Sequence, residues 1–142
     1  MYKRQGKLTI EIKDKNGNLK DQIDLTNLVV DDGLEFIASR MKDASSSVMS
    51  HMAIGTGSSA AAASDTTLGT EAARVALTST TVTANAVAYV ASFAAGTGTG
   101  AITEAGILNN SSGGSLLCRT VFSVINKGAS DSMTITWTIT IS

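Results

Sequence analysis

The chain has 142 residues, a length at which one domain can bury its own hydrophobic core without disulfides or metals. Hydrophobic residues make up 43 % of it, the formal net charge is −1, and proline is absent. This composition excludes an intrinsically disordered chain. The near-neutral charge argues against nucleic acid as the main partner, because phosphate binding needs a basic face.

Individual residue types exclude several kinds of site. No apolar run approaches the roughly 18 residues that a membrane-spanning helix needs, so we expect no membrane partner. The basic N-terminus is followed by alternating charged residues rather than the apolar segment of a signal peptide, which predicts a protein that is not secreted by that route. The single Cys118 and the single His51 leave a disulfide framework and a zinc site short of ligands. We therefore expect no metal and no cofactor, with Cys118 as a small core residue and His51 partly buried in a strand.

Charge is distributed unevenly along the chain. Residues 1–43 hold 8 of the 11 Lys and Arg residues and 8 of the 12 Asp and Glu residues, whereas the remaining 99 residues hold 7 charges. A surface rich in Ser, Thr, Ala and Gly can pack against another protein without the desolvation of many charges. The pattern therefore indicates a subunit of an assembly.

The first segment, residues 1–26, is typical of a β-hairpin. Leu8, Ile10 and Ile12 alternate with polar residues, which is the two-residue period of a half-buried strand, and Asn-Gly-Asn at 16–18 favours a tight turn. We expect this charged hairpin to stay solvated or to reach a partner protein of the assembly, so that its deletion leaves the oligomer intact. The basic residues expected at that contact are Lys3, Arg4, Lys7, Lys13 and Lys15.

One helix is predicted, over residues 32–43. Leu34, Ile37 and Met41 fall on one face at helical spacing, together with Ala38. Asp31 and Asp32 precede them and are good N-cap residues, so we expect a side-chain cap at this end.

Residues 48–142 read as strands separated by turns at intervals of about ten residues. In the last of these strands Ile135, Trp137 and Ile139 alternate with threonine, which predicts that all three point into the core. The sequence therefore predicts one mainly β domain over residues 1–142. We expect a β-sandwich or jelly-roll-like body over 48–142, with an N-terminal hairpin and one short α-helix.

No enzymatic motif is found. The alternating glycines at 96–100 are not followed by a helix, as a phosphate-binding loop requires, and no nucleophile elbow is present. Glu71 and Glu104 could be read as a glycosidase pair, but the few aromatic residues offer little platform for a sugar. The better interpretation is that isolated charges among apolar strands form structural pairs, and the third predicted hairpin brings Glu104 close to Arg119. The residues expected in such pairs are Glu71, Arg74, Glu104 and Arg119.

Several motifs resemble those of small virion proteins of tailed bacteriophages. They lie at residues 27–34 (NLVVDDGL), 51–57 (HMAIGTG), 68–74 (LGTEAAR), 103–107 (TEAGI) and 134–139 (TITWTI). The resemblance covers residues 27–142 and implies a β-rich subunit of the phage particle, assembled in the host cytoplasm, that acts through oligomeric contacts. It supplies no catalytic residues.

Two hypotheses follow from this resemblance and from the charge-poor strands. The first is a non-enzymatic head decoration (cement) protein that binds the major capsid protein as a homotrimer and stabilises the head. The second is a tail component, such as a fibre adaptor, collar or baseplate module, with a receptor-binding role. The number of copies in each particle distinguishes the two.

Overall fold

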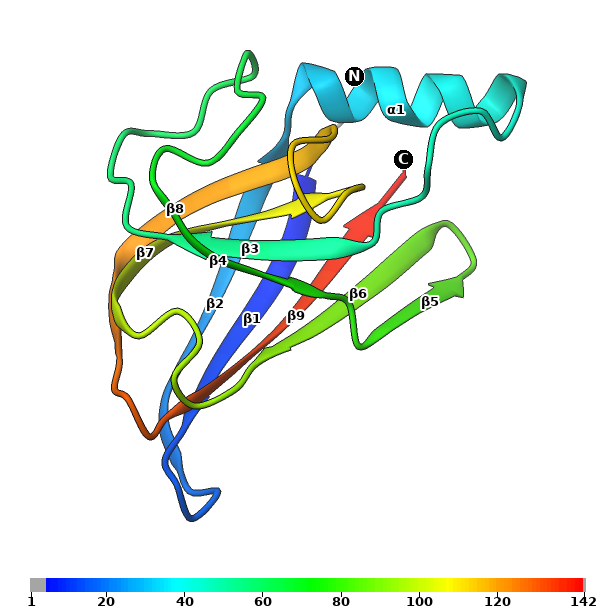
Figure 1. Cartoon of the computed structure of the whole chain (residues 1–142). Helices are drawn as coiled ribbons and strands as arrows, with labels where there is room; N and C mark the ends of the chain where they lie inside the picture. The colour runs from blue at the N-terminus through cyan, green and yellow to red at the C-terminus, as the bar shows by residue number, and fades with distance from the viewer. Residues whose placement is uncertain (1–4, 142) are drawn as a thin grey trace.

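The computed structural model describes residues 5–141 and confirms a mainly β protein with one short helix (Figure 1). The elements, in chain order, are β1 (Gln5–Lys13), β2 (Leu19–Val29), α1 (Asp31–Lys42), β3 (His51–Gly55), β4 (Glu71–Ala76), β5 (Ser79–Thr83), β6 (Ala86–Phe93), β7 (Gly100–Leu108), β8 (Leu116–Lys127) and β9 (Ser132–Thr140).

Within residues 5–141 the nine strands form one curled antiparallel sheet in the order β4-β3-β7-β8-β2-β1-β9-β6-β5. Hydrogen bonds join every neighbouring pair in this order, so the predicted sandwich or jelly roll is not confirmed. The two ends of the sheet are consecutive in the chain, because only residues 77–78 separate β4 from β5. The amides of both connecting residues are bonded, Leu77 to the Ser50 carbonyl and Thr78 to the Val90 carbonyl.

The inner face of the curled sheet holds the main core. Alternate residues of β1 and β9 point into it, and their registers place Leu8 opposite Trp137 and Ile10 opposite Ile135. Trp137 is fully buried, and its indole Nε1 donates a 2.9 Å hydrogen bond to Oδ1 of Asn27. Ile135 and Ile139 are buried on the same face.

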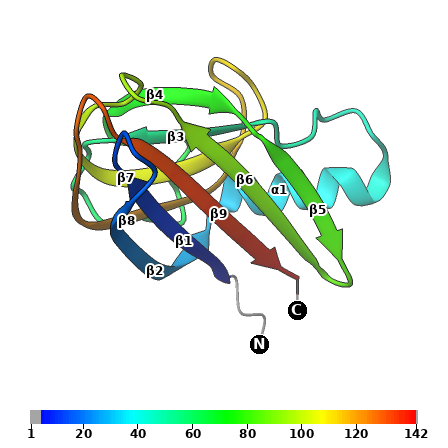
Figure 2. The same ribbon diagram turned by 90° about the horizontal axis from the view of Figure 1, so that it is seen from below.

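The N-terminal hairpin occupies the middle of the sheet, although the sequence predicts an element that stays solvated or reaches a partner. β1 pairs with β2 on one side and with β9 on the other, and β2 pairs with β8 (Figure 2). Leu8, Ile10 and Ile12 are at most 1 % exposed. Residues 1–26 therefore contribute central strands, and the oligomer cannot be expected to survive their deletion.

The helix α1 agrees with the predicted range to within one residue, but the predicted cap is wrong. Val30 stands at the N-cap without a side-chain hydrogen bond. The Oδ2 of Asp32 instead accepts a 2.6 Å bond from the amide of Leu116, and this bond ties the first helical turn to β8. Gly33 is buried at the same place, where the helix meets the backbone of Leu117.

The long loop between β3 and β4 covers the outer face of β3, β7 and β8. A second cluster of buried apolar residues lies beneath it: Val30, Ala53, Leu68, Leu108 and Leu116. Where the loop covers it, this half of the sheet is therefore buried on both faces. The other half, made by β9, β6 and β5, has no such cover within the described part of the chain.

Candidate functional site

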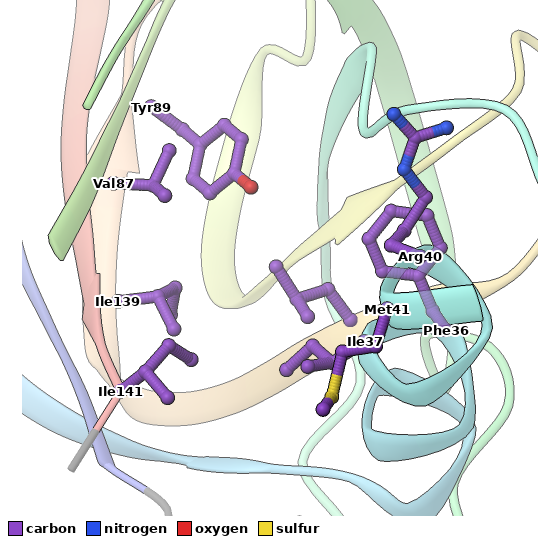
Figure 3. A pocket seen from close by; sticks show the side chains of 9 residues that line it. Phe36, Ile37, Arg40, Met41, Val87, Tyr89, Ile139 and Ile141 are labelled. Atoms are coloured by element: carbon purple, nitrogen blue, oxygen red, sulfur yellow. The ribbon is translucent and has the colours of Figure 1, made fainter. Parts of the chain in front are cut away.

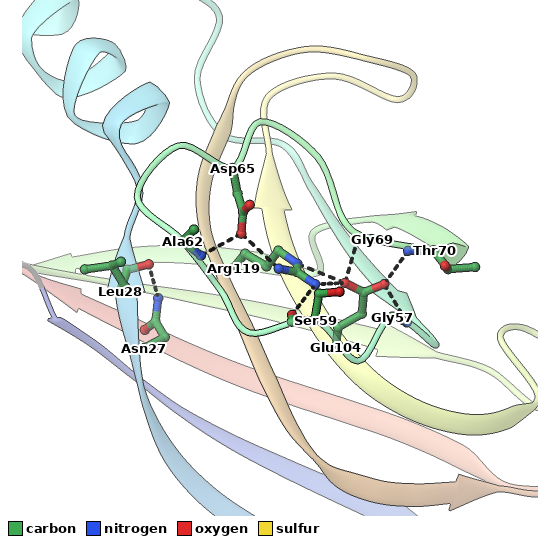
Figure 4. Close-up of polar contacts among 10 residues, drawn as sticks. All are labelled: Asn27, Leu28, Gly57, Ser59, Ala62, Asp65, Gly69, Thr70, Glu104 and Arg119. Carbon is green, nitrogen blue, oxygen red and sulfur yellow. Dashed lines mark hydrogen bonds and ion pairs between the residues drawn. The ribbon is translucent and has the colours of Figure 1, made fainter.

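The central polar feature of the molecule is the carboxylate of Glu104, which is fully buried on β7 (Figure 4). Its Oε1 accepts hydrogen bonds from the amides of Thr70 at 2.7 Å and Gly57 at 2.9 Å. Its Oε2 accepts bonds from the amide of Gly69 at 2.8 Å and from Nε of Arg119 at 2.9 Å. A single side chain thus fixes both ends of the β3–β4 loop.

Arg119, on β8, extends this network to the middle of the same loop. The side chain is 3 % exposed and forms an ion pair with Glu104 and another with Asp65, at 2.9 Å each. It also donates a 3.1 Å bond to the carbonyl of Ser59. The Oδ2 of Asp65 accepts a further bond from the amide of Ala62.

The pKa values of this network follow from burial opposed by its partners. Burial by itself raises the pKa of Glu104, but the bonds from Thr70, Gly69, Arg119 and Gly57 together lower it below its ordinary value. Burial likewise lowers the pKa of Arg119, and the two carboxylates raise it above its ordinary value. Both groups therefore stay charged at neutral pH, a state suited to holding a loop and not to exchanging protons.

The two remaining predicted charges, Glu71 and Arg74, form a second anchor at β4. Arg74 binds Glu71 through two parallel bonds, Nε–Oε2 at 3.0 Å and NH2–Oε1 at 2.7 Å. Its NH1 donates to the carbonyls of Asn110 and Gly113 at 2.9 Å each. The structure thus places the four predicted charges in two pairs, and each pair also holds backbone of a neighbouring loop.

The network explains three of the motifs noted in the sequence. Residues 51–57, 68–74 and 103–107 meet around the Glu104 carboxylate, and Oγ1 of Thr103 donates to the Gly57 carbonyl at 2.8 Å. A Cβ on Gly57 would collide with the Glu104 carboxylate, which accounts for glycine at this position. In this chain these motifs build the loop anchor.

A second buried charge cluster was missed from the sequence. Lys127 is 1 % exposed and donates to the carbonyls of Ala94 at 2.9 Å and Asp131 at 2.8 Å. Burial lowers its pKa, while the charge of Asp131 opposes this effect. Asp131 in turn pairs with Lys20 at 2.7 Å. The sequence feature that could have revealed this cluster is a lysine and an aspartate on either side of a turn in an otherwise charge-poor region.

The structure describes three of the five basic residues that were predicted to contact a capsid protein. Lys7 lies on the outer face of β1, and Lys13 and Lys15 lie at the β1–β2 turn, all three exposed. Lys3 and Arg4 lie outside the described residues. The β1–β2 turn projects beyond the rest of the molecule (Figure 1).

The outer face of β9, β6 and β5 carries no charge. We call this surface the uncharged face, and its residues are Thr134, Thr136, Thr138, Ala88, Val90, Ser92, Ser79, Thr81 and Thr83. Its last strand, β5, is exposed along its whole length and pairs only with β6 among the described strands. Val82 in this strand is 70 % exposed. Unpaired, uncharged strand edges are sites at which another chain can add.

The last surface feature is a cleft of about 300 Å³ between α1 and the inner face of the sheet (Figure 3). Its lining is mostly apolar: Phe36, Ile37, Met41, Val87, Leu117, Ile139 and Ile141, with Tyr89 and Arg40. At its rim Met41 and Ile141 are 85 % and 50 % exposed. The helix therefore leaves part of its apolar face exposed.

Neither His51 nor Cys118 forms part of a cluster. His51 is partly buried on β3 with Nδ1 2.8 Å from Oγ of Ser50, and Cys118 is fully buried in the core, as expected. Burial raises the pKa of the Cys118 thiol well above its ordinary value. Among residues 5–141 no group of three or more His, Cys, Asp and Glu side chains is placed to hold a metal ion. In the same range no helix is long and apolar enough to cross a membrane.

Comparisons with protein-family models, with curated proteins and with solved structures give no match for this chain.

Proposed function

We propose that the protein is a non-enzymatic structural subunit of a phage particle, and specifically a head decoration protein that binds the major capsid protein as a homotrimer. The observation that carries this proposal is the uncharged face together with the free edge of β5. Nine neighbouring residues present only hydroxyl groups and small apolar side chains. Such a surface is desolvated at low cost when another subunit covers it.

The buried charges support a structural role as well. Glu104, Arg119, Glu71 and Arg74 are bonded to each other and to the backbone of loops. Each has its hydrogen-bonding groups directed at protein atoms, as expected of residues that fix a shape. A subunit repeated many times on a lattice needs rigid loops, because weak contacts add up only when every copy presents the same geometry.

The proposed contact with the capsid protein is now assigned to exposed lysines at the turn of the hairpin. Because the hairpin is central, the element that can reach a partner is its turn, which carries Lys13 and Lys15. Electrostatic contacts of this kind set orientation and association rate and weaken with salt. Replacing both lysines by glutamate should reduce binding to heads while leaving the fold and the oligomer intact.

Two measurements test the proposal. Multi-angle light scattering should find a trimer at micromolar concentration, and a stable monomer would contradict the oligomer. Densitometry of purified particles should find hundreds of copies. A number of roughly six or twelve, as tail symmetry imposes, would instead place the protein in the tail.

A variant of the β5 edge tests which surface forms the oligomer. Val82→Lys puts a charge on the exposed edge and should shift the mass measured by light scattering toward the monomer. Val124→Lys is the matched control, because Val124 is also exposed, at 54 %, but lies on β8. Equal effects of the two changes would exclude a specific role for β5.

A further inference from the structure

The cleft beneath α1 has the features of a small-molecule site. It is enclosed by the helix on one side and by β6 and β9 on the other (Figure 3). An apolar cavity of roughly 150 Å³ accepts benzene, so about 300 Å³ has room for an apolar body about twice as large. Pockets of this kind use a few polar groups to orient a ligand within an apolar lining.

Tyr89 provides the first of these polar groups. Its side chain is 8 % exposed, and its hydroxyl points into the space between sheet and helix (Figure 3). Within residues 5–141 this hydroxyl has no hydrogen-bond partner. In the same range, every side-chain nitrogen or oxygen atom that is closed off from solvent does have a partner, so the Tyr89 hydroxyl is not closed off. The hydroxyl is therefore open to the cleft and available to a ligand. Buried tyrosines usually satisfy this group within the protein.

Arg40 provides the second polar group, at the rim. Its NH1 donates to the carbonyl of Ser46 at 2.8 Å, and in the described part of the chain it forms no ion pair with a carboxylate. The neighbouring Lys42, by contrast, pairs with Asp43 at 2.7 Å. Within residues 5–141 the guanidinium thus forms no hydrogen-bonded pair with an acidic side chain, although its charge contributes to lowering the pKa of Asp43.

We propose that this cleft binds an amphipathic monocarboxylate, such as a medium-chain fatty acid, with its chain between α1 and β9 and its carboxylate at Arg40. The apolar lining accepts the chain, and the guanidinium and the Tyr89 hydroxyl supply hydrogen bonds to oxygen. A cationic amphiphile of the same length lacks this complementarity. The inference does not depend on the proposed virion role.

Calorimetric titration with decanoate, decan-1-ol and decylammonium, each below its micelle concentration, tests the proposal. Decanoate should bind saturably, with one molecule to each chain. Decylammonium should bind at least about tenfold more weakly, because it brings a second cation to Arg40. Equal affinity for the two ions, or no saturable binding of decanoate, would overturn the proposal.

Four variants assign the binding to the cleft. Arg40→Gln should weaken decanoate binding about tenfold and leave decan-1-ol unchanged, since only the carboxylate uses the charge. Lys42→Gln, which removes a cation from the same helical turn outside the lining, should leave both unchanged. Tyr89→Phe should weaken both oxygen-bearing ligands. Ile37→Trp should fill the cleft and abolish all binding.

Each variant is first compared with the wild type by near-ultraviolet circular dichroism and thermal unfolding. Equal losses for Arg40→Gln and Lys42→Gln would show a general charge effect and contradict the assigned site. If Ile37→Trp lowers the mass of the oligomer and the wild type binds no decanoate, a second copy of the chain covers the cleft and the ligand proposal is wrong.

Discussion

The carboxylate of Glu104 connects three separate loop amides to a buried arginine, so its removal should affect more than one contact. Glu104→Gln keeps the shape but puts an amide NH₂ where an oxygen accepts bonds, and it leaves Arg119 buried with one carboxylate fewer. Breaking a buried ion pair from one side costs about 3–5 kcal/mol. We expect a loss of this size in urea unfolding. The matched change Glu71→Gln, at a partly exposed pair, should cost less than about 1 kcal/mol.

The same carboxylate predicts a pH dependence. The pKa of Glu104 is lower in the folded protein than its ordinary value of 4.5, so the unfolded chain binds the proton more readily in acid. Its contribution to the free energy of unfolding is therefore complete above pH 4.5 and is lost as the pH falls through the folded value. Urea unfolding between neutral and acidic pH should show this loss in the wild type and a flatter profile in Glu104→Gln. Parallel profiles would contradict the assignment.

Trp137 is the largest fully buried side chain, and its indole N–H donates a hydrogen bond to Oδ1 of Asn27. Trp137→Ala should cost about 3–5 kcal/mol in urea unfolding, through the cavity it leaves. Trp137→Phe should cost less but leaves Oδ1 of Asn27 without its donor. A change below about 1 kcal/mol for the alanine variant would contradict the central position of this residue.

At the scale of elements, two substitutions in α1 compare a glycine that is packed against β8 with an alanine that is exposed. Replacing a helical glycine by alanine usually stabilises by about 1 kcal/mol. Gly33→Ala should instead destabilise by about 1–3 kcal/mol, because the added Cβ would collide with the carbonyl of Leu117. Ala38→Gly, at an exposed position of the same helix, should cost only about 1 kcal/mol. Thermal unfolding measures both, and a stabilising Gly33→Ala would show that the helix does not pack closely on β8.

Some elements could be predicted from the sequence because they depend on local periodicity, whereas the strand expected over 74–83 is divided into β4 and β5. Leu8, Ile10 and Ile12 gave the first strand, and the spacing of Leu34 and Ile37 gave the helix. The cap was mispredicted because Asp32 has a partner far along the chain, the amide of Leu116, and local preference cannot reveal such a partner. Tertiary contacts outweighed the local signal there.

At the scale of the whole molecule, the single sheet could not be distinguished from a sandwich. Alternation shows which face of a strand is buried, but it does not show which strand lies beside it. The β3–β4 loop adds to the difficulty, since it buries the outer face of β7 and β8 as a second sheet would.

Part of the candidate site was predictable, most directly where two side chains pair across a hairpin. Glu104 and Arg119 lie on the adjacent strands β7 and β8, so their proximity could be inferred. Asp65 and the amides of Gly57 and Gly69 come from the loop, and backbone donors carry no side-chain signal. The cleft under α1 depends on how far the helix stands from β9, which no sequence period encodes.

The central hairpin yields a prediction for truncation. Removal of residues 1–26 takes away β1 and most of β2, which lie between β8 and β9. The remaining chain should lose cooperative unfolding and near-ultraviolet circular dichroism, and it should aggregate. A folded, soluble truncated protein would show that the rest of the sheet can close without these strands.

The pairing of β1 with β9 also sets an order of events during synthesis. The two strands are separated by more than a hundred residues. The apolar side of β1 therefore leaves the ribosome long before β9, its second partner strand, has been made. Sheets built from such distant contacts fold slowly, on a scale of roughly milliseconds to seconds. Until β9 has been made, Leu8, Ile10 and Ile12 lack half of their cover. The growing chain should therefore bind chaperones until β9 emerges and become protease-resistant only after that point.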